Sequence, residues 1–229
     1  MIGVIVPAHD EEALIEACVE SLLKAAAHPD LAQEPVRIIV VLDDCRDHTG
    51  RLARSLGVHT IDVKLKNVGF ARQAGAKVAL GHGARWLAFT DADSVVAPDW
   101  LVSQLALKAD AVCGTVAVDN WGSYGERMRR HFQLTYTDAD GHAHIHGANL
   151  GVSAAAYATA GGFLGLKTSE DVALVEALRA TGANIAWSSR PRVVTSVREN
   201  FRAPGGFGAT LATIERLGQW AGAKVGLAT

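Results

Sequence analysis

The first half of the chain alternates short β-branched, apolar runs with stretches whose apolar side chains recur every three to four residues. This alternation limits the fold strongly, because strands that alternate with helices pair in parallel through right-handed crossovers. We expect strands at residues 3–6, 36–42, 58–63, 86–90 and 111–118, and helices at residues 11–27, 47–56, 68–81 and 98–109. The pattern predicts an α/β fold with a mostly parallel central sheet flanked by helices.

The second half is less regular. We expect a helix after Tyr124, a turn that enters a strand within residues 138–152, and helices at residues 153–160 and 169–181. A strand near residues 184–187 and a loop rich in Arg, Pro and Gly precede a final amphipathic helix. The chain contains no internal repeat and no good linker, so residues 1–229 are predicted to form one domain. Residues 1–118 and 119–229 would be its two halves.

Composition excludes several classes of protein. The 22 Lys and Arg against 24 Asp and Glu give a net charge of −2, which does not favour a nucleic-acid partner. A hydrophobic content of 49% excludes global disorder, and three cysteines without CxxC spacing argue against a disulfide scaffold or structural zinc. We see no signal peptide or transmembrane segment and expect a cytoplasmic location. The apolar side of residues 208–228 fits a core helix, a homodimer contact or peripheral attachment to a membrane equally well.

Charged residues follow several of the expected strands, and α/β sheets bind ligands beyond the carboxyl ends of their strands. The first strand runs into PAHDEE, where His9 or Asp10 can begin the next helix; the second ends in LDDCRDHT, where Asp47 is placed to cap one. Helix-dipole complementation and a capped surface turn explain these two segments equally well. After the third strand, KLKNVGFARQAG places cations at a helix start, which suits phosphate or a solvated basic face.

The fourth strand ends in FTDADS, which is the sharper signal. Residues two apart in an extended chain point the same way, so Asp91 and Asp93 can share one cation. Two carboxylates this close repel each other unless a positive charge lies between them. A hard divalent ion such as Mg²⁺ or Mn²⁺, held also by diphosphate oxygens, satisfies both groups.

Together the motifs VPAHDEE, VVLDDCRDHT, KNVGFARQAG, FTDADS, HGANLGV…GGF and SEDVAL resemble, in order and rough spacing, those of the family 2 glycosyltransferases. The resemblance covers essentially the whole chain. It implies the GT-A fold, with a Rossmann-like N-terminal half, and a UDP- or GDP-linked sugar donor. It also implies Mn²⁺ or Mg²⁺ as cofactor.

The resemblance also implies residue roles. The nucleotide-sugar would be held by Pro7, Ala8, Glu11, Asp43, Asn67, Arg72, Asp91, Ala92 and Asp93. Asp93 would be the firmer metal ligand and Asp91 the weaker. The pair Glu170 and Asp171 would supply the general base, with Asp171 preferred. The acceptor, whose identity stays open, would contact His146, Gly147, Ala148 and Asn149.

Two departures from the family pattern bear on mechanism. Gln73 follows Arg72 where the family has ARN, and no QxxRW motif follows the acidic pair, since Gln219 and Trp220 are adjacent. The second departure favours transfer of one sugar at a time over processive synthesis. The expected chemistry is inverting, with Asp171 deprotonating the acceptor hydroxyl. Arg198 and Arg202 could close over the phosphates, or could simply lie in a solubilising loop.

Other interpretations remain open at this point. One is a nucleotidyltransferase of similar fold, although the N-terminus lacks its Gly-rich phosphate loop. Another is a non-catalytic nucleotide-sugar-binding protein. The alternating His142, His144 and His146 would share one face of a strand, where they could bind a metal, line the acceptor site or simply satisfy backbone partners.

Overall fold

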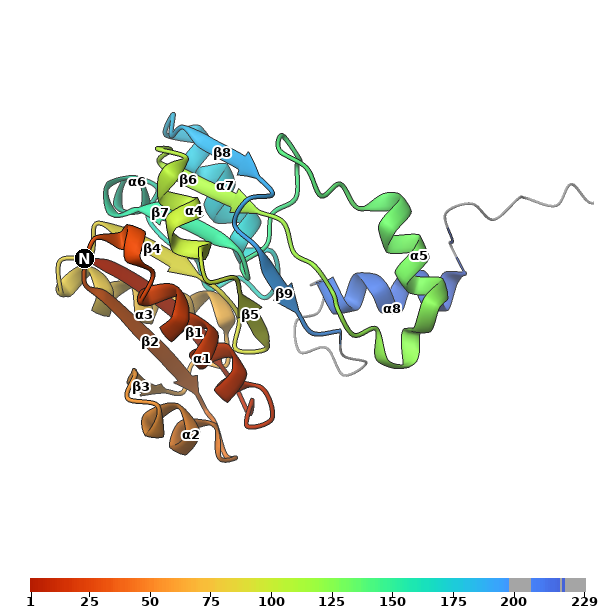
Figure 1. The fold of residues 1–229 in the computed structure, drawn as a ribbon, viewed down its shortest axis with the longest axis horizontal. Coiled ribbons are helices and arrows are strands. Elements are labelled where there is room, and N and C mark those ends of the chain that lie inside the picture. The colour runs from red at the N-terminus through yellow and green to blue at the C-terminus, as the bar shows by residue number, and fades with distance from the viewer. Residues whose placement is uncertain (198–206, 219, 221–229) are drawn as a thin grey trace, which may run out of the picture.

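A computed structural model describes residues 1–197, 207–218 and 220. Its centre is a seven-stranded sheet of order β3-β2-β1-β4-β7-β6-β8 (Figure 1). In that order the strands are β3 (His59–Val63), β2 (Val36–Asp43), β1 (Ile2–Ala8), β4 (Trp86–Phe89), β7 (Leu150–Ser153), β6 (Ala111–Gly114) and β8 (Ile185–Ser188). The five expected N-terminal strands and the strand near residue 185 are therefore confirmed, within a few residues at their ends.

The strand β7 runs opposite to the rest of the sheet. It pairs antiparallel with both β4 and β6, whereas β1, β2, β3 and β4 pair in parallel. The segment between β6 and β7 explains the reversal, because it carries no helix back across the sheet. The chain leaves the sheet at the carboxyl end of β6, forms α5 (Gly125–Thr135) outside the sheet, and enters β7 from that same end.

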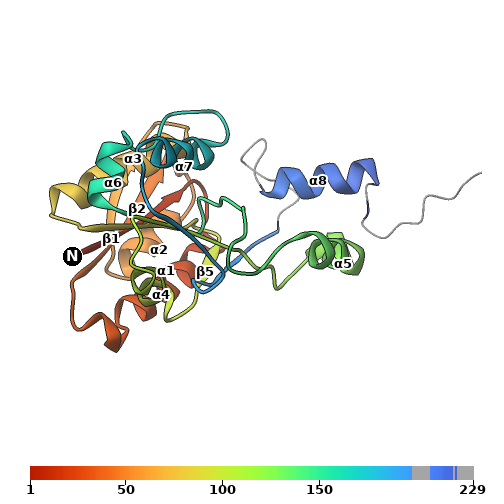
Figure 2. The same cartoon turned by 90° about the horizontal axis from the view of Figure 1, so that it is seen from above.

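Three helices cover each face of the sheet (Figure 2). One face packs against α1 (Ile15–Ala26), α2 (Thr49–Ser55) and α4 (Trp100–Ala106). The other packs against α3 (Val68–Gly81), α6 (Ala154–Thr159) and α7 (Glu170–Ala180). The helix α3 lies very close to the strands, since a Cβ at Gly75 would be 2.6 Å from Ile5 and 2.9 Å from Val41. Small residues on α3 therefore let its backbone approach the sheet.

A second sheet consists of two short antiparallel strands, β5 (Ser94–Val96) and β9 (Val193–Thr195). Sequence patterns did not predict either strand, because three residues show too little periodicity. The Ser94 hydroxyl donates to Thr195 Oγ1 at 3.0 Å, across 101 positions of sequence. This pairing brings the segment after β9 to the end of β4.

The helices α5 (Gly125–Thr135) and α8 (Phe207–Leu217) form a separate lobe, which projects from the sheet in both views (Figures 1 and 2). The short helix η2 (Gly122–Tyr124) leads into it. The lobe has a small core of its own around Trp121, Met128 and Leu211. No helix within the described residues is long and apolar enough to cross a bilayer.

One expected helix start is wrong. We expected the first helix over residues 11–27, with His9 or Asp10 at its start, but α1 begins at Ile15. Asp10 adopts a positive φ of 50°, and its Oδ1 accepts the amide of Arg46 at 2.7 Å and that of Asp47 at 3.3 Å. The Asp10 carboxylate therefore ties two strand-end loops together instead of capping a helix.

Candidate active site

The carboxyl end of β4 gathers most of the residues singled out by the sequence, around the side chain of Arg72. Arg72 projects from α3 and is 3% exposed. Its Nη2 donates to Asp91 Oδ1 at 2.6 Å, and its Nη1 donates to Glu170 Oε1. Three segments far apart in sequence are thus joined through one guanidinium: α3, the loop after β4 and the start of α7.

Charge keeps this guanidinium ionised although it is out of water. Burial by itself lowers the pKa of Arg72, but the negative charges of Asp91, Glu170 and Asp171 outweigh it and hold that pKa above its usual value. The ring of Phe163 lies 5.5 Å from the guanidinium carbon. A buried arginine with carboxylates on two sides is a rigid support for those carboxylates.

Asp171 lies beside this network, half-buried at the first turn of α7. Its Oδ2 accepts the amide of Gly147 at 2.9 Å, and its Oδ1 accepts the amide of Val172 at 2.8 Å. Gly147 is pressed against the arginine, because a Cβ there would be 2.5 Å from Arg72 Nη2. The expected acceptor loop and the expected base are therefore in direct contact.

Asp91 and Asp93 lie at the end of β4, and both are partly exposed. Ser196, just after β9, donates to Asp93 Oδ2 at 2.9 Å. The thiol of Cys18 on α1 donates to the carbonyl of Asp91 at 3.4 Å. Burial, and then the charges of Asp93, Asp91 and Glu11, raise the pKa of that thiol. The negative charges of Asp91, Asp93 and Glu11 therefore all affect the same thiol, that of Cys18.

The carboxylate oxygens of the candidate site suit a hard divalent cation. Asp91, Glu170 and Asp171 act on a single guanidinium, so the cluster carries more negative than positive charge. A nucleoside diphosphate would be repelled by such a site unless a cation came with it. Carboxylate oxygens from one or two aspartates, together with phosphate oxygens, are the usual ligands of Mg²⁺ and Mn²⁺. Asp93 and Asp91 are the residues that would hold the ion.

Within the part of the chain that the structure describes, one group of three side chains has ligand atoms close enough to share a metal, and it lies elsewhere. It consists of Asp10, Cys45 and Asp47. Asp10 binds two backbone amides, while the Asp47 carboxylate accepts from the Thr49 amide at 2.9 Å and the Glu12 amide at 3.0 Å. These hydrogen bonds join the loops after β1 and β2, so they explain why the three side chains lie close together without a metal ion.

Asp43 and Asn67 shape the loop between β3 and α3. The buried Asp43 carboxylate accepts the amides of Leu65 at 2.6 Å, Lys66 at 2.9 Å and Asn67 at 3.0 Å. Asn67 caps α3 by accepting the Phe70 amide at 2.9 Å, and its Nδ2 donates to the carbonyl of Leu166 at 2.8 Å. Both side chains thus hold the loop that carries α3, and Arg72, into the site.

The acceptor-loop residues have different environments. Ala148 and Asn149 are buried, and the Asn149 side chain bonds to Trp100, Thr115 and Pro191. In this conformation the amide of Asn149 is committed to the fold. His146 instead contacts the hydroxyl of Tyr136, at 2.9 Å from its Nε2.

Burial, and then the charges of His144 and His142, lower the pKa of His146 to about 4, against a smaller opposing effect of Asp91. The imidazole of His146 is therefore neutral at pH 7. The rings of His142, His144 and His146 stack in sequence, 5.5 and 5.9 Å apart. They share one face as expected, although residues 142–146 form no strand.

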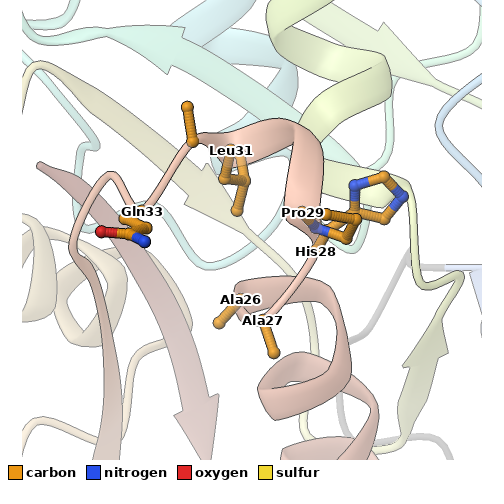
Figure 3. Close-up of a pocket in the computed structure, with 7 residues that line it drawn as sticks. Ala26, Ala27, His28, Pro29, Leu31 and Gln33 are labelled. Carbon is orange, nitrogen blue, oxygen red and sulfur yellow. The ribbon is translucent and has the colours of Figure 1, made fainter.

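A cavity at the opposite end of the sheet does not fit this chemistry (Figure 3). It lies where α1 ends and the short helix η1 (Pro29–Leu31) begins, and alanine, proline and leucine side chains supply much of its lining. His28 is its one titratable lining side chain, and the Nδ1 of that residue already accepts the Asp30 amide at 3.2 Å. The candidate site is therefore the one around Arg72.

The sequence model of "Glycosyl transferase family 2" matches residues 3–159. The chain belongs to glycosyl transferase family 2. The matched segment includes β1, β2 and β4 with the loops that follow them, the whole of α3, and the HGAN loop. Glu170 and Asp171 lie beyond it. No match was found among curated proteins.

Solved structures support the same family fold. TarS 1–349 of S. aureus, in complex with UDP-GlcNAc, is similar with a TM-score of 0.65 and 18% identity, over 90% of this chain and 61% of that one. The mannosyltransferase PcManGT from Pyrobaculum calidifontis, in complex with GDP-Man and Mn²⁺, gives 0.62 and 19%, over 87% and 57%. GalNAc-T7 with UDP, GalNAc and Mn²⁺ gives 0.64 and 16%, over 86% and 44%. This chain thus spans about three fifths of TarS 1–349 and less of the other two, and it has the GT-A fold.

The structure brings together Arg72, Asp91, Gly147, Glu170 and Asp171 in one network. Asp93 follows Asp91 by two residues, and the amide of Glu11 donates to Thr49 at 2.6 Å. Pro7 and Ala8 end β1, next to Val41 and Leu42 of β2. Ala92 is buried. Arg198 and Arg202 lie outside the described residues.

Sequence reasoning missed Ser196 and Tyr136, which hold Asp93 and His146. Each of these contacts joins a motif residue to a segment that has no motif of its own.

Proposed function

We propose that this chain transfers a sugar from a UDP- or GDP-linked donor to an acceptor hydroxyl, in a metal-dependent, inverting and non-processive reaction. One observation carries the proposal. Four segments of the family pattern (the loop after β4, the HGAN loop, the start of α7 and Arg72 of α3) meet through Arg72 and Asp171. An isolated acidic pair would not indicate a function. Here the acidic side chains and the Arg72 guanidinium lie together at the carboxyl ends of the strands, where α/β sheets bind their ligands.

The donor side of the site comprises the ends of β1, β2 and β4. Pro7, Ala8, Glu11 and Ala92 form the backbone and carboxylate lining for the nucleotide, while Asp43 and Asn67 fix the loop before α3. Arg72 holds Asp91 in place. Asp93 and Asp91 would hold Mn²⁺ or Mg²⁺, which would supply positive charge to offset the negative charge of the departing diphosphate. Arg198 and Arg202 would bind the phosphates.

On the acceptor side, Asp171 takes the proton from the attacking hydroxyl. A bond forms between the acceptor oxygen and the anomeric carbon, and the bond from that carbon to the diphosphate oxygen breaks, with its electron pair leaving on the diphosphate. Because attack comes from the opposite face, the anomeric configuration inverts. The Gly147 amide keeps the Asp171 carboxylate oriented. A general base of this kind contributes about 10²–10⁴-fold in rate.

His146, Gly147, Ala148 and Asn149 would bound the acceptor side, with His146 and the Gly147 backbone closest to the base. Glu170 supports the base indirectly, because it is buried and paired with Arg72. The absence of a QxxRW motif from the sequence supports release after one transfer.

The test is donor turnover. Wild type is incubated with UDP-glucose, UDP-N-acetylglucosamine and GDP-mannose in Mn²⁺, and nucleoside diphosphate release is followed. We expect release with at least one donor, and loss of release in EDTA or in Asp93→Ala. Asp62→Ala is the matched control, since Asp62 is an exposed carboxylate on β3 that pairs with Arg54, outside the candidate site. Pyrophosphate release from a nucleoside triphosphate would support a nucleotidyltransferase, and donor binding without turnover a non-catalytic binder.

A further inference from the structure

A second cavity, of about 540 Å³, lies between α5 and the segment that follows β6. Its walls include Val116, Asp119, Trp121, Phe132, Gln133 and Tyr136. This volume is within the range of small-molecule sites. None of these residues belongs to the motifs of the family pattern, and the catalytic network does not use the cavity.

The cavity is connected to the proposed base by two hydrogen bonds. The hydroxyl of Tyr136, in the cavity wall, accepts the amide of Val116 at 2.9 Å and is hydrogen-bonded to His146 Nε2, 2.9 Å away. The next residue, Gly147, donates to Asp171 at 2.9 Å. A molecule in this cavity would therefore lie on the acceptor side of the site.

The apolar wall is rigid and aromatic. The ring of Phe132 lies 5.3 Å from that of Trp121 and 4.4 Å from that of Tyr136, nearly parallel to the latter at 18°. The far face of Tyr136 stacks on His144 at 4.0 Å. The stacked rings hold one another in place, so the wall is apolar and little side-chain entropy is lost when an occupant packs against it.

The polar groups of the cavity indicate which occupant fits. Asp119 and Gln133 are exposed, and neither side chain forms a hydrogen bond or ion pair within the described part of the chain. A glutamine amide both donates and accepts, and a carboxylate accepts strongly. Vicinal sugar hydroxyls match this pair. A lipid chain would cover both groups without bonding to them, which costs free energy.

Charge argues against a phosphorylated acceptor. The cavity also contains Arg129 and Asp138. Arg129 pairs with Glu126 at 3.2 Å. Asp138 accepts the Thr115 hydroxyl at 2.7 Å and forms an ion pair with Arg192 at 3.7 Å. Because Arg129 and Asp138 are both paired with opposite charges, the exposed Asp119 leaves the lining negative, and this disfavours an anion.

We propose that this cavity is an acceptor subsite and that its occupant is an uncharged saccharide unit. The inference rests on the proposed function and names the acceptor class for the same site. Asp119 and Gln133 would bind the hydroxyls of that unit, while the aromatic wall packs against its ring.

The test is direct binding, which does not require turnover. Saturation-transfer NMR is recorded with methyl glycosides of glucose, galactose, mannose and N-acetylglucosamine, on wild type, Asp119→Ala and Gln133→Ala. Arg130→Ala is the control, because Arg130 is an exposed α5 residue outside the cavity. We expect at least one glycoside to bind wild type and Arg130→Ala equally, and to bind each cavity variant at least tenfold more weakly. Circular dichroism confirms that all variants are folded.

Binding that is equal in all four proteins, or no binding of any glycoside, overturns the inference. So does preferential binding of dodecyl phosphate, which would indicate a lipid-phosphate acceptor. Failure of the proposed function looks different: wild type would release no nucleoside diphosphate from any donor, whatever the glycosides do.

Discussion

The amide of Gly147 donates to Asp171 at 2.9 Å, while the same glycine lies against the guanidinium of Arg72. Gly147, which has no side chain, therefore lies between the proposed base, Asp171, and the arginine that holds Glu170 and Asp91. The separation is set by backbone, which is stiffer than a pair of side chains.

Gly147→Ala should reduce donor turnover by at least tenfold. A Cβ at this position would be 2.5 Å from Arg72 Nη2 and 2.9 Å from Nη1, so the guanidinium must move away from Asp91 and Glu170. Gly81→Ala is the control, because nothing lies within 4 Å of a Cβ at the end of α3. Nucleoside diphosphate release by the two variants would be compared. Equal rates would show that the guanidinium position does not matter to turnover.

Arg72→Gln should lower the free energy of unfolding by about 3–5 kcal/mol, because it leaves the buried Glu170 carboxylate without its cation. Arg54→Gln removes an exposed partner of Asp62, 2.6 Å away, and should cost about 1 kcal/mol or less. Urea denaturation measures both. If adding Glu170→Gln to Arg72→Gln restored no stability, the loss would not come from the unpaired carboxylate.

Acid should destabilise the protein partly through His146. Its pKa in the fold is about 4, below the usual 6.5, so the unfolded chain takes up the proton first as the pH falls. The stability that the neutral imidazole contributes is complete above pH 6.5 and is lost toward pH 4, by up to about 1.4 kcal/mol per pH unit. His144, whose pKa burial also lowers, adds in the same direction.

This pH dependence is measured by comparing wild type with His146→Gln, which keeps a polar partner for Tyr136. The unfolding free energy of wild type should fall relative to that of the variant between pH 6.5 and pH 4. Parallel curves over that range would mean that His146 is protonated as readily in the fold as in the unfolded chain.

Local signals predicted much of the N-terminal half. The helix α3 begins and ends where its pattern placed it, because Asn67 caps it and its small apolar residues fit the sheet. The strand boundaries of β1 and β2 also lie within two residues of expectation. In these elements the local preference and the tertiary packing agree.

Long-range contacts account for what the sequence did not predict. Asp10 looked like a helix cap, yet its carboxylate binds amides 36 and 37 residues away. Arg72 and Glu170 are 98 residues apart in the sequence, and no periodic pattern predicts that they pair. Asn149 belongs to a motif expected to touch substrate, and its side chain is instead satisfied by Trp100 and two backbone carbonyls. Residue type alone does not distinguish a ligand contact from a buried support.

The most direct test of the account compares Asp171→Asn with Glu176→Gln, a neutralised exposed carboxylate on the same helix. Donor turnover and nucleoside diphosphate affinity are measured for both in Mn²⁺. The account predicts that Asp171→Asn keeps its nucleotide affinity but loses at least a hundredfold in turnover, while Glu176→Gln matches wild type. Wild-type turnover in Asp171→Asn would contradict it.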